Sequence, residues 1–146
     1  MQTRLDYGKA APGSVQAMYK LQKYVDESGL EHSLLELVKT RVSQMNGCAF
    51  CIDMHTKDAR AAGETEQRLY GLSAWREAPF YSERERAALA WAEAVTNMPQ
   101  VNESDEEYEA ARAQFSAEEL IKLTVVVLAI DGWNRLATSF REPAGT

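Results

Sequence analysis

The chain has 146 residues, a length that fits one domain with a hydrophobic core of its own. Hydrophobic residues make up 45% of it and charged residues 26%, with eight glycines and four prolines, which excludes a disordered or low-complexity protein. The 22 acidic residues outnumber the 16 basic ones and give a net charge of −6, so we expect no binding to nucleic acid or to an anionic membrane.

Three helices are predicted in the first part of the chain by apolar residues that recur every three or four positions. The first occupies residues 12–29, beginning at a proline and stopping at a glycine. The second carries its apolar residues over positions 34–45 and ends at Asn46-Gly47, a pair suited to a left-handed helix end. The third covers residues 48–63. Because the turn between the second and third helices is short, we expect them to pack as an antiparallel hairpin.

The second half of the chain is also predicted to be helical. A short helix follows Gly63-Glu64-Thr65, and no β-hairpin turn lies between alternating strands in this sequence. Three serine–glutamate pairs have the spacing of a capping box at a helix start: Ser82 with Glu85, Ser104 with Glu107, and Ser116 with Glu119. We therefore assign the chain to the all-α class, as a single domain over residues 1–146.

The last helix is predicted from Ala117 to about Thr138 and contains an apolar, partly β-branched run from Leu123 to Ile130. Periodicity alone does not separate a buried helix from a buried strand, but the rest of the sequence offers no partner strand. We expect a helix buried on all sides. Part of its cover would come from another subunit, which makes the chain a homo-oligomer.

The location expected for the chain is the cytoplasm, with no membrane partner. Residues 1–14 carry charges throughout and lack an apolar core of signal-peptide length. The longest apolar run, Val125–Ile130, is far shorter than the ~20 residues that a membrane-spanning helix needs. Thiols are kept reduced in the cytoplasm, so a close pair of cysteines there indicates redox catalysis or metal binding more often than a structural crosslink.

Cys48 and Cys51 are three residues apart, which places both on one face of the first turn of the third helix. At that spacing they can form a disulfide or share a metal ion. The helix N-terminus stabilises the thiolate, which is the reactive form of cysteine. His55 follows Cys51 by four residues on the same face, where it can accept the thiol proton or hydrogen-bond the thiolate.

Glu36 is predicted to complete the site. It lies about 15 Å along its helix before the turn at Asn46-Gly47, and His55 lies about 12 Å along the facing helix after it, at 1.5 Å per residue. The two side chains should therefore stand at nearly the same level of the hairpin. Glu36 also falls among apolar residues, where an inward-facing carboxylate needs a partner.

Each of these residues also has an interpretation that involves no redox catalysis. Zinc held by the two cysteines, His55 and Glu36 is one alternative, although only one Cys-x-x-Cys is present and structural zinc prefers four cysteine or histidine ligands. Taken singly, His55 could be a core or surface histidine and Glu36 a solvated helix residue. The other histidine, His32, is expected at the surface. The tryptophans are expected in the core: Trp75, Trp91 and Trp133.

With these residues in view, the sequence closely resembles the alkylhydroperoxidase D-like family of the carboxymuconolactone decarboxylase superfamily. The signature of that family is a glutamate, a Cys-x-x-Cys beginning twelve positions later, and a histidine four residues after the second cysteine. These positions are matched by Glu36, Cys48, Cys51 and His55. The likeness covers residues 35–96 and extends to the late segment DGWNRLATSFR.

The resemblance implies an all-α fold that assembles as a trimer or hexamer, without a metal or organic cofactor. The activity we expect is thiol-dependent reduction of hydrogen peroxide or organic hydroperoxides. Cys51 attacks the peroxide and becomes a sulfenic acid, Cys48 condenses with it to a disulfide, and an external thiol or dithiol reduces that bond. Glu36 orients His55 and stabilises its protonated form. The position at the helix start also favours a thiolate at Cys48, so which cysteine attacks first stays open.

Two other functions are weighed against this one. The first is a lyase like the decarboxylases that give the superfamily its name, which need no cysteine pair. The second is a non-catalytic redox-sensing or assembly protein whose thiol pair controls oligomer packing. Two positions also depart from the family pattern: Phe50 replaces a second histidine, and Asp131 stands where the late helix is expected to carry asparagine.

Overall fold

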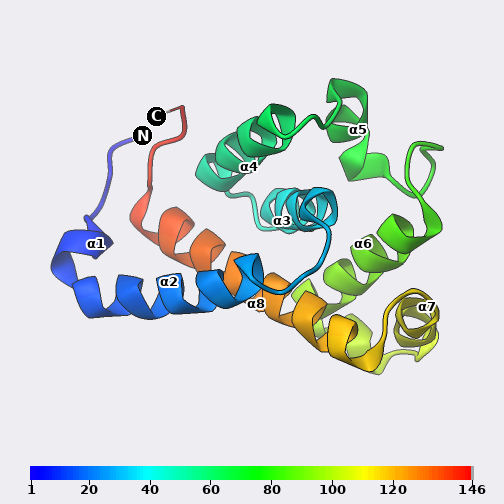
Figure 1. Ribbon diagram of the computed structural model, residues 1–146. Coiled ribbons are helices and arrows are strands. Elements are labelled where there is room, and N and C mark those ends of the chain that lie inside the picture. Colours follow the sequence, from blue (N-terminus) through cyan, green and yellow to red (C-terminus); the bar gives the residue numbers. More distant parts are fainter. Residues whose placement is uncertain (146) are drawn as a thin grey trace.

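Helices and the turns between them make up the chain (Figure 1). The computed structural model describes residues 1–145, and no strand occurs among them. The α-helices are α1 (Tyr7–Ala10), α2 (Pro12–Asp26), α3 (His32–Met45), α4 (Ala49–Ala61), α5 (Glu66–Tyr70), α6 (Glu83–Thr96), α7 (Glu106–Gln114) and α8 (Ala117–Phe140), with 3-10 turns η1 (Leu72–Ala74) and η2 (Met98–Asn102). The all-α prediction is confirmed, and α1 and the two 3-10 turns are additions to it.

The centre of the fold is α3, which packs against α4, α6 and α8 (Figure 1). Its residues Leu37, Val38 and Val42 are fully shielded from solvent. Burying a side chain of this size stabilises the folded chain by roughly 1.5–3 kcal/mol. Because so many apolar neighbours surround α3, a polar side chain on the same helix is also held away from water, and the site described below depends on this.

The capping predictions are confirmed at two helix starts and wrong at the third. Ser82 and Ser116 each form a reciprocal capping box with the glutamate three residues later. At the remaining start, α7 has Asp105 rather than Ser104 as its N-cap. The Ser104 hydroxyl accepts a hydrogen bond from the backbone N–H of Glu106, two residues on, at 3.4 Å. This is the geometry of a serine turn, so Ser104 closes the preceding loop instead of capping the helix.

Within the single chain α8 is not buried on all sides, as expected for a helix whose cover was predicted to come in part from another subunit. Leu123, Val126 and Val127 are fully buried, whereas Ile121 is 65% exposed and Leu128 is 55% exposed. These last two residues lie seven positions apart and therefore share a face of the helix. The packing of α2, α3, α4, α6 and α7 against α8 does not reach that face. An apolar strip thus stays open to solvent.

The turn between α3 and α4 has the geometry that the sequence predicted. Gly47 has a φ of +66°, the left-handed conformation that glycine adopts without strain. The Asn46 side-chain amide donates to Asp131 Oδ1 at 2.7 Å and to Asn134 Oδ1 at 3.0 Å, both on α8. The carboxylate of Asp131 can therefore serve as the acceptor that an asparagine oxygen would otherwise supply. These bonds fix the start of α4 against α8.

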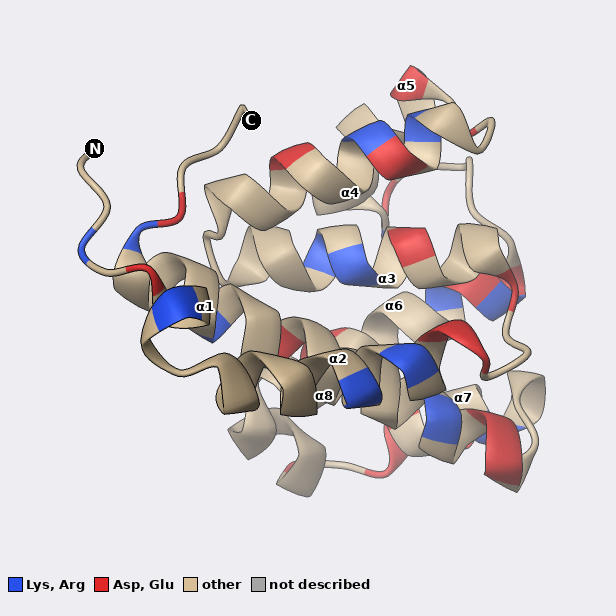
Figure 2. Cartoon of the chain, turned by 60° about the vertical axis from the view of Figure 1, so that its left-hand side comes forward, with Lys and Arg blue, Asp and Glu red and all other residues tan. Residues whose placement is uncertain are grey.

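Charged residues are dispersed over the molecule. Figure 2 shows Lys and Arg residues interspersed with Asp and Glu residues along the helices, without a continuous basic face. None of the helices within residues 1–145 combines the length and the apolar character needed to cross a membrane.

Candidate functional site

The two cysteines meet at the N-terminus of α4. Cys48 is the N-cap residue, and its sulfur accepts a hydrogen bond from the backbone N–H of Cys51 at 3.3 Å. The Cα atoms of the two residues are 5.3 Å apart, their sulfur atoms form a disulfide, and both side chains are buried. When the disulfide is reduced, the same N–H group and the helix N-terminus are placed to stabilise a thiolate.

Glu36 of α3 and His55 of α4 face each other across the hairpin. His55 Nδ1 lies 3.2 Å from Glu36 Oε2, and the two residues are only 8% and 5% exposed. The prediction from helical rise that they stand at one level is confirmed. An ionised carboxylate can only accept, so Nδ1 carries the proton in this bond. The other ring nitrogen, Nε2, is then left available to exchange a proton with another group.

Lys39 is a third charged group in this cluster, and the sequence analysis missed it. Its ammonium lies 3.3 Å from Glu36 Oε1, one helical turn along α3, and the side chain is buried. His32 is largely exposed, as predicted, and its Nε2 lies 3.8 Å from the same carboxylate oxygen. A lysine three residues after an inward-facing glutamate, within an apolar helix, is the signal that could have revealed Lys39.

The charge balance favours an ionised Glu36. Burial by itself raises the pKa of this carboxyl group. The hydrogen bond from His55 and the nearby Lys39 ammonium outweigh that effect and hold the pKa below its ordinary value. Glu36 is therefore negatively charged at neutral pH, and it stabilises positive charge on the imidazole ring it holds.

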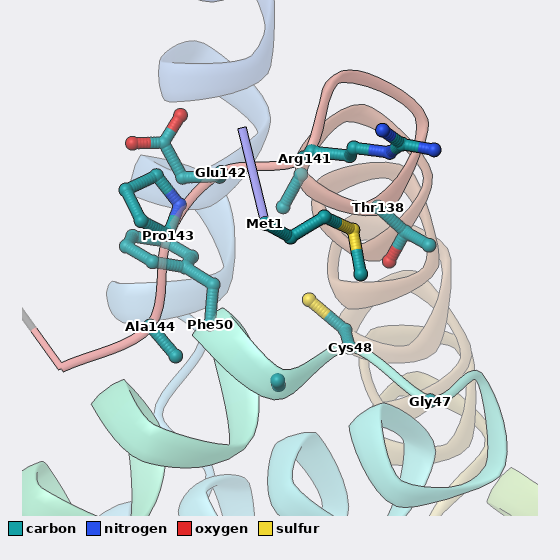
Figure 3. A pocket seen from close by; sticks show the side chains of 11 residues that line it. Met1, Gly47, Cys48, Phe50, Thr138, Arg141, Glu142, Pro143 and Ala144 are labelled. Atoms are coloured by element: carbon teal, nitrogen blue, oxygen red, sulfur yellow. The ribbon is translucent and has the colours of Figure 1, made fainter. Parts of the chain in front are cut away.

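Each cysteine opens onto a different cavity. Cys51 and His55 line a cavity of about 460 Å³ with apolar and aromatic walls, which include Tyr7, Val15, Tyr19, Met54 and Trp133. Cys48 lines a separate cavity of about 290 Å³, bounded by the end of α8 and the segment after it. Figure 3 shows the Cys48 sulfur pointing into this second cavity, toward Met1. Phe50 lines both cavities.

Three side chains of the site could offer ligand atoms to a metal ion. Glu36, His55 and the exposed Asp58 place ligand atoms within 4.8 Å of one another. The ammonium of Lys39, at 3.3 Å from Glu36, competes for the same carboxylate. Cysteines joined in a disulfide supply no thiolate ligand, so a metal site that used them would require the reduced pair.

The tryptophan predictions are confirmed in full for one residue and in part for two. Trp75 is buried, and its indole N–H donates to Glu93 at 2.8 Å. Trp91 and Trp133 are half-buried. Trp133 also contributes to the wall of the Cys51 cavity, a role that its apolar surroundings in the sequence did not reveal.

Comparison with known proteins gives consistent matches. The Carboxymuconolactone decarboxylase family profile matches residues 12–94. The uncharacterized protein YdfG of Bacillus subtilis (strain 168) is 43% identical over 146 residues, which is 100% of this chain and 99% of that protein. A crystal structure of a protein of unknown function from Agrobacterium tumefaciens, provisionally named antioxidant defence protein AhpD, has a TM-score of 0.95 and 46% identity over 99% of both chains. The debrominase Bmp8 shares the fold, with a TM-score of 0.84 and 21% identity over 94% of this chain and 74% of that one.

Proposed function

The chain belongs to the carboxymuconolactone decarboxylase family and is similar to its AhpD-like members, and on this basis we propose that it is a thiol-dependent peroxidase. Its substrates are hydrogen peroxide or organic hydroperoxides, and its electrons come from an external thiol or dithiol in the cytoplasm. One observation carries the proposal: a cysteine pair at a helix N-terminus lies beside a histidine that a buried glutamate holds.

The oxidative half of the cycle begins with the reduced pair. The Cys51 thiolate attacks the nearer peroxide oxygen, the O–O bond breaks, and the departing alkoxide takes a proton to become an alcohol. Cys51 is left as a sulfenic acid. The Cys48 thiol then attacks the Cys51 sulfur, water leaves, and the disulfide forms. The Cα separation of 5.3 Å is within the range that a disulfide requires, so this last step needs no large backbone movement.

His55 and Glu36 act together in this proposal. His55 takes the proton of Cys51 and returns it to the departing oxygen, which is general acid–base catalysis. Glu36 holds Nδ1 of the ring, so the proton is exchanged at Nε2. The negative charge of Glu36 stabilises the imidazolium that forms when the thiol is deprotonated. Lys39 serves as a positioning residue that keeps Glu36 ionised.

The lining of the Cys51 cavity supports organic hydroperoxides as substrates. Tyr7, Tyr19, Met54 and Trp133 provide apolar surface beside the sulfur and the imidazole. A volume of about 460 Å³ lies within the range of small-molecule sites. Hydrogen peroxide needs no such surface, whereas an alkyl or aryl hydroperoxide gains binding energy by burying its carbon atoms there.

A turnover assay tests the proposal. Purified protein with excess dithiothreitol should consume cumene hydroperoxide over many cycles, and Cys51→Ser should abolish consumption. A single stoichiometric oxidation followed by no further turnover would contradict an enzyme and identify a redox sensor. Decarboxylation of a lactone acid that persists in a Cys48→Ser/Cys51→Ser double variant would identify a lyase instead.

We further propose that the chain assembles as a homo-oligomer, either a trimer or a hexamer. The apolar strip on α8 that includes Ile121 and Leu128 supports this, because neither residue is covered within the chain. Covering apolar surface gains roughly 25 cal/mol per Å². Light scattering of the purified protein measures the assembly directly, and a stable monomer at micromolar concentration would refute it.

A further inference from the structure

The two cysteines of the disulfide line different, neighbouring cavities. The cavity of about 460 Å³ is lined by Cys51 but not Cys48, and the cavity of about 290 Å³ is lined by Cys48 but not Cys51. His55 lines only the Cys51 cavity of these two. Phe50, Ala137 and Glu142 line both and therefore form the wall between them.

The two cavities also differ in chemistry. The Cys51 cavity carries aromatic and apolar side chains from α1, α2, α4 and α8. The Cys48 cavity is smaller, and its lining mixes apolar side chains with the polar groups of Thr138 and Arg141 at the end of α8 (Figure 3). The first suits a hydroperoxide with a carbon skeleton. The second suits a small, flexible dithiol that brings sulfur to Cys48.

We infer that the reducing dithiol enters through the Cys48 cavity and attacks the Cys48 sulfur, while peroxide reaches Cys51 through the neighbouring Cys51 cavity. Only the peroxide half rests on the proposed function, because the disulfide can be reduced whatever oxidant formed it. This arrangement assigns one entrance to the oxidant and another to the reductant. The two reactants therefore do not compete for one cavity.

The chemistry of exchange favours attack on Cys48. The thiolate of the donor bonds to Cys48 Sγ, the S–S bond breaks, and its electron pair leaves with Cys51 Sγ. A leaving thiolate that is stabilised departs faster, and Cys51 shares its cavity with His55, which can donate a proton or a hydrogen bond. Attack on Cys51 would instead expel Cys48, which the Cys51 N–H and the helix N-terminus stabilise as a thiolate but whose cavity contains no histidine to donate a proton.

The second step completes the electron balance. The remaining thiol of the donor attacks its own sulfur in the mixed disulfide and expels Cys48 as a thiolate. The donor leaves as a cyclic or linked disulfide, having given two electrons to the protein. The two protons released by the donor thiols equal the two needed to return both cysteines to thiols.

Trapping the mixed disulfide tests which sulfur is attacked. The full chain is oxidised with diamide, exposed briefly to glutathione and quenched with excess iodoacetamide. Trypsin then releases residues 42–57, which contain both cysteines, and fragment ions separate Cys48 from Cys51. We expect glutathione on Cys48 and the alkyl group on Cys51. The reverse labelling would overturn the inference, and the result is the same whether or not the protein consumes peroxide.

Cavity-filling variants test which side each reactant uses. Thr138→Trp obstructs the Cys48 cavity, Met54→Trp obstructs the Cys51 cavity, and Ser139→Trp adds the same side chain to an exposed position that lines neither. Disulfide reduction by dithiothreitol should slow by roughly tenfold or more in the first variant relative to the second, a difference of about 1.4 kcal/mol in the barrier. Oxidation of the reduced protein by cumene hydroperoxide should show the opposite order.

The Ser139→Trp control and the position of the glutathione label make this test decisive. Ser139→Trp should follow the wild-type rates in both half-reactions. Equal slowing of reduction by Thr138→Trp and Met54→Trp would show a shared entrance and overturn the inference. If either tryptophan prevents folding, the glutathione position in the wild-type protein still decides the outcome.

Discussion

Replacing Glu36 by glutamine removes the charge that supports the imidazole while keeping size and one oxygen acceptor. Oε2 of Glu36 lies 3.2 Å from His55 Nδ1 in a site where both side chains are buried. Two unit charges at that distance interact by about 5 kcal/mol at an effective dielectric constant of 20. Part of this stabilisation of the imidazolium is lost in the variant, because an amide oxygen is only a dipole.

The expected consequence is a thiol that is harder to deprotonate. The apparent pKa of the reactive cysteine should rise, because the imidazolium–thiolate pair loses its supporting charge. Peroxide consumption near neutral pH should fall by about 10²–10⁴-fold, the usual effect of losing positioned acid–base help. The loss should shrink at alkaline pH, where the thiolate forms without a base.

A companion variant separates this effect from a loss of stability. In Glu36→Gln the buried Lys39 ammonium also loses its carboxylate, and an unpaired buried charge costs about 3–5 kcal/mol. Glu36→Gln/Lys39→Met removes that charge as well and should recover much of the stability, but not the rate. His55→Gln should resemble Glu36→Gln in rate, and combining them should add little, because residues that act as one unit are not additive.

The assay is the pH dependence of thiol alkylation by iodoacetamide in the reduced protein. Wild type should give a profile displaced to lower pH than that of Glu36→Gln. Superimposable profiles would refute the reasoning and leave Glu36 as a structural partner of Lys39 and His55.

Three further predictions concern assembly and stability. Leu128→Glu places a charge on the exposed apolar strip of α8 and should shift the oligomer toward monomer in light scattering, with helicity unchanged. Thr40 is fully buried, and its hydroxyl has no hydrogen-bond partner among residues 1–145, so Thr40→Val should raise the free energy of unfolding by about 1 kcal/mol in urea titrations. Glu93 is buried, which raises its pKa, but hydrogen bonds from Trp75 and Arg41 lower it below the ordinary 4.5. The ionised Glu93 therefore stabilises the fold at neutral pH, and this stabilisation is lost as the pH falls below 4.5. The free energy of unfolding of Glu93→Gln should be lower than that of wild type by about 1.5–3 kcal/mol at pH 7, and this difference should become smaller in acid.

Much of the fold could be predicted because its determinants are local. The spacing of apolar residues predicted where the main helices lie, and reciprocal serine–glutamate pairs predicted the starts of α6 and α8. The matching level of Glu36 and His55 in the hairpin followed from helical rise and one tight turn, both of which can be counted along the chain. Ser104 was mistaken for an N-cap because the same side chain also stabilises a serine turn, and the sequence pattern does not separate the two.

Features that depend on contacts between distant segments could not be predicted in this way. The exposure of Leu128 depends on how many helices reach α8, which its own apolar sequence does not reveal. The two cavities depend on where Tyr7 and Thr138 come to lie beside the start of α4, although these residues are far apart in the chain. The role of Asp131 as an acceptor for Asn46 depends on packing between the α3–α4 turn and α8.

Counting thiols after peroxide treatment tests the central claim most directly. Reduced protein given one equivalent of cumene hydroperoxide should lose both free thiols per chain and recover them with dithiothreitol, and Cys48→Ser should react once to leave a sulfenic acid on Cys51 that dimedone captures. Two cysteines that stay titratable after peroxide treatment would contradict the claim that this pair reduces peroxides.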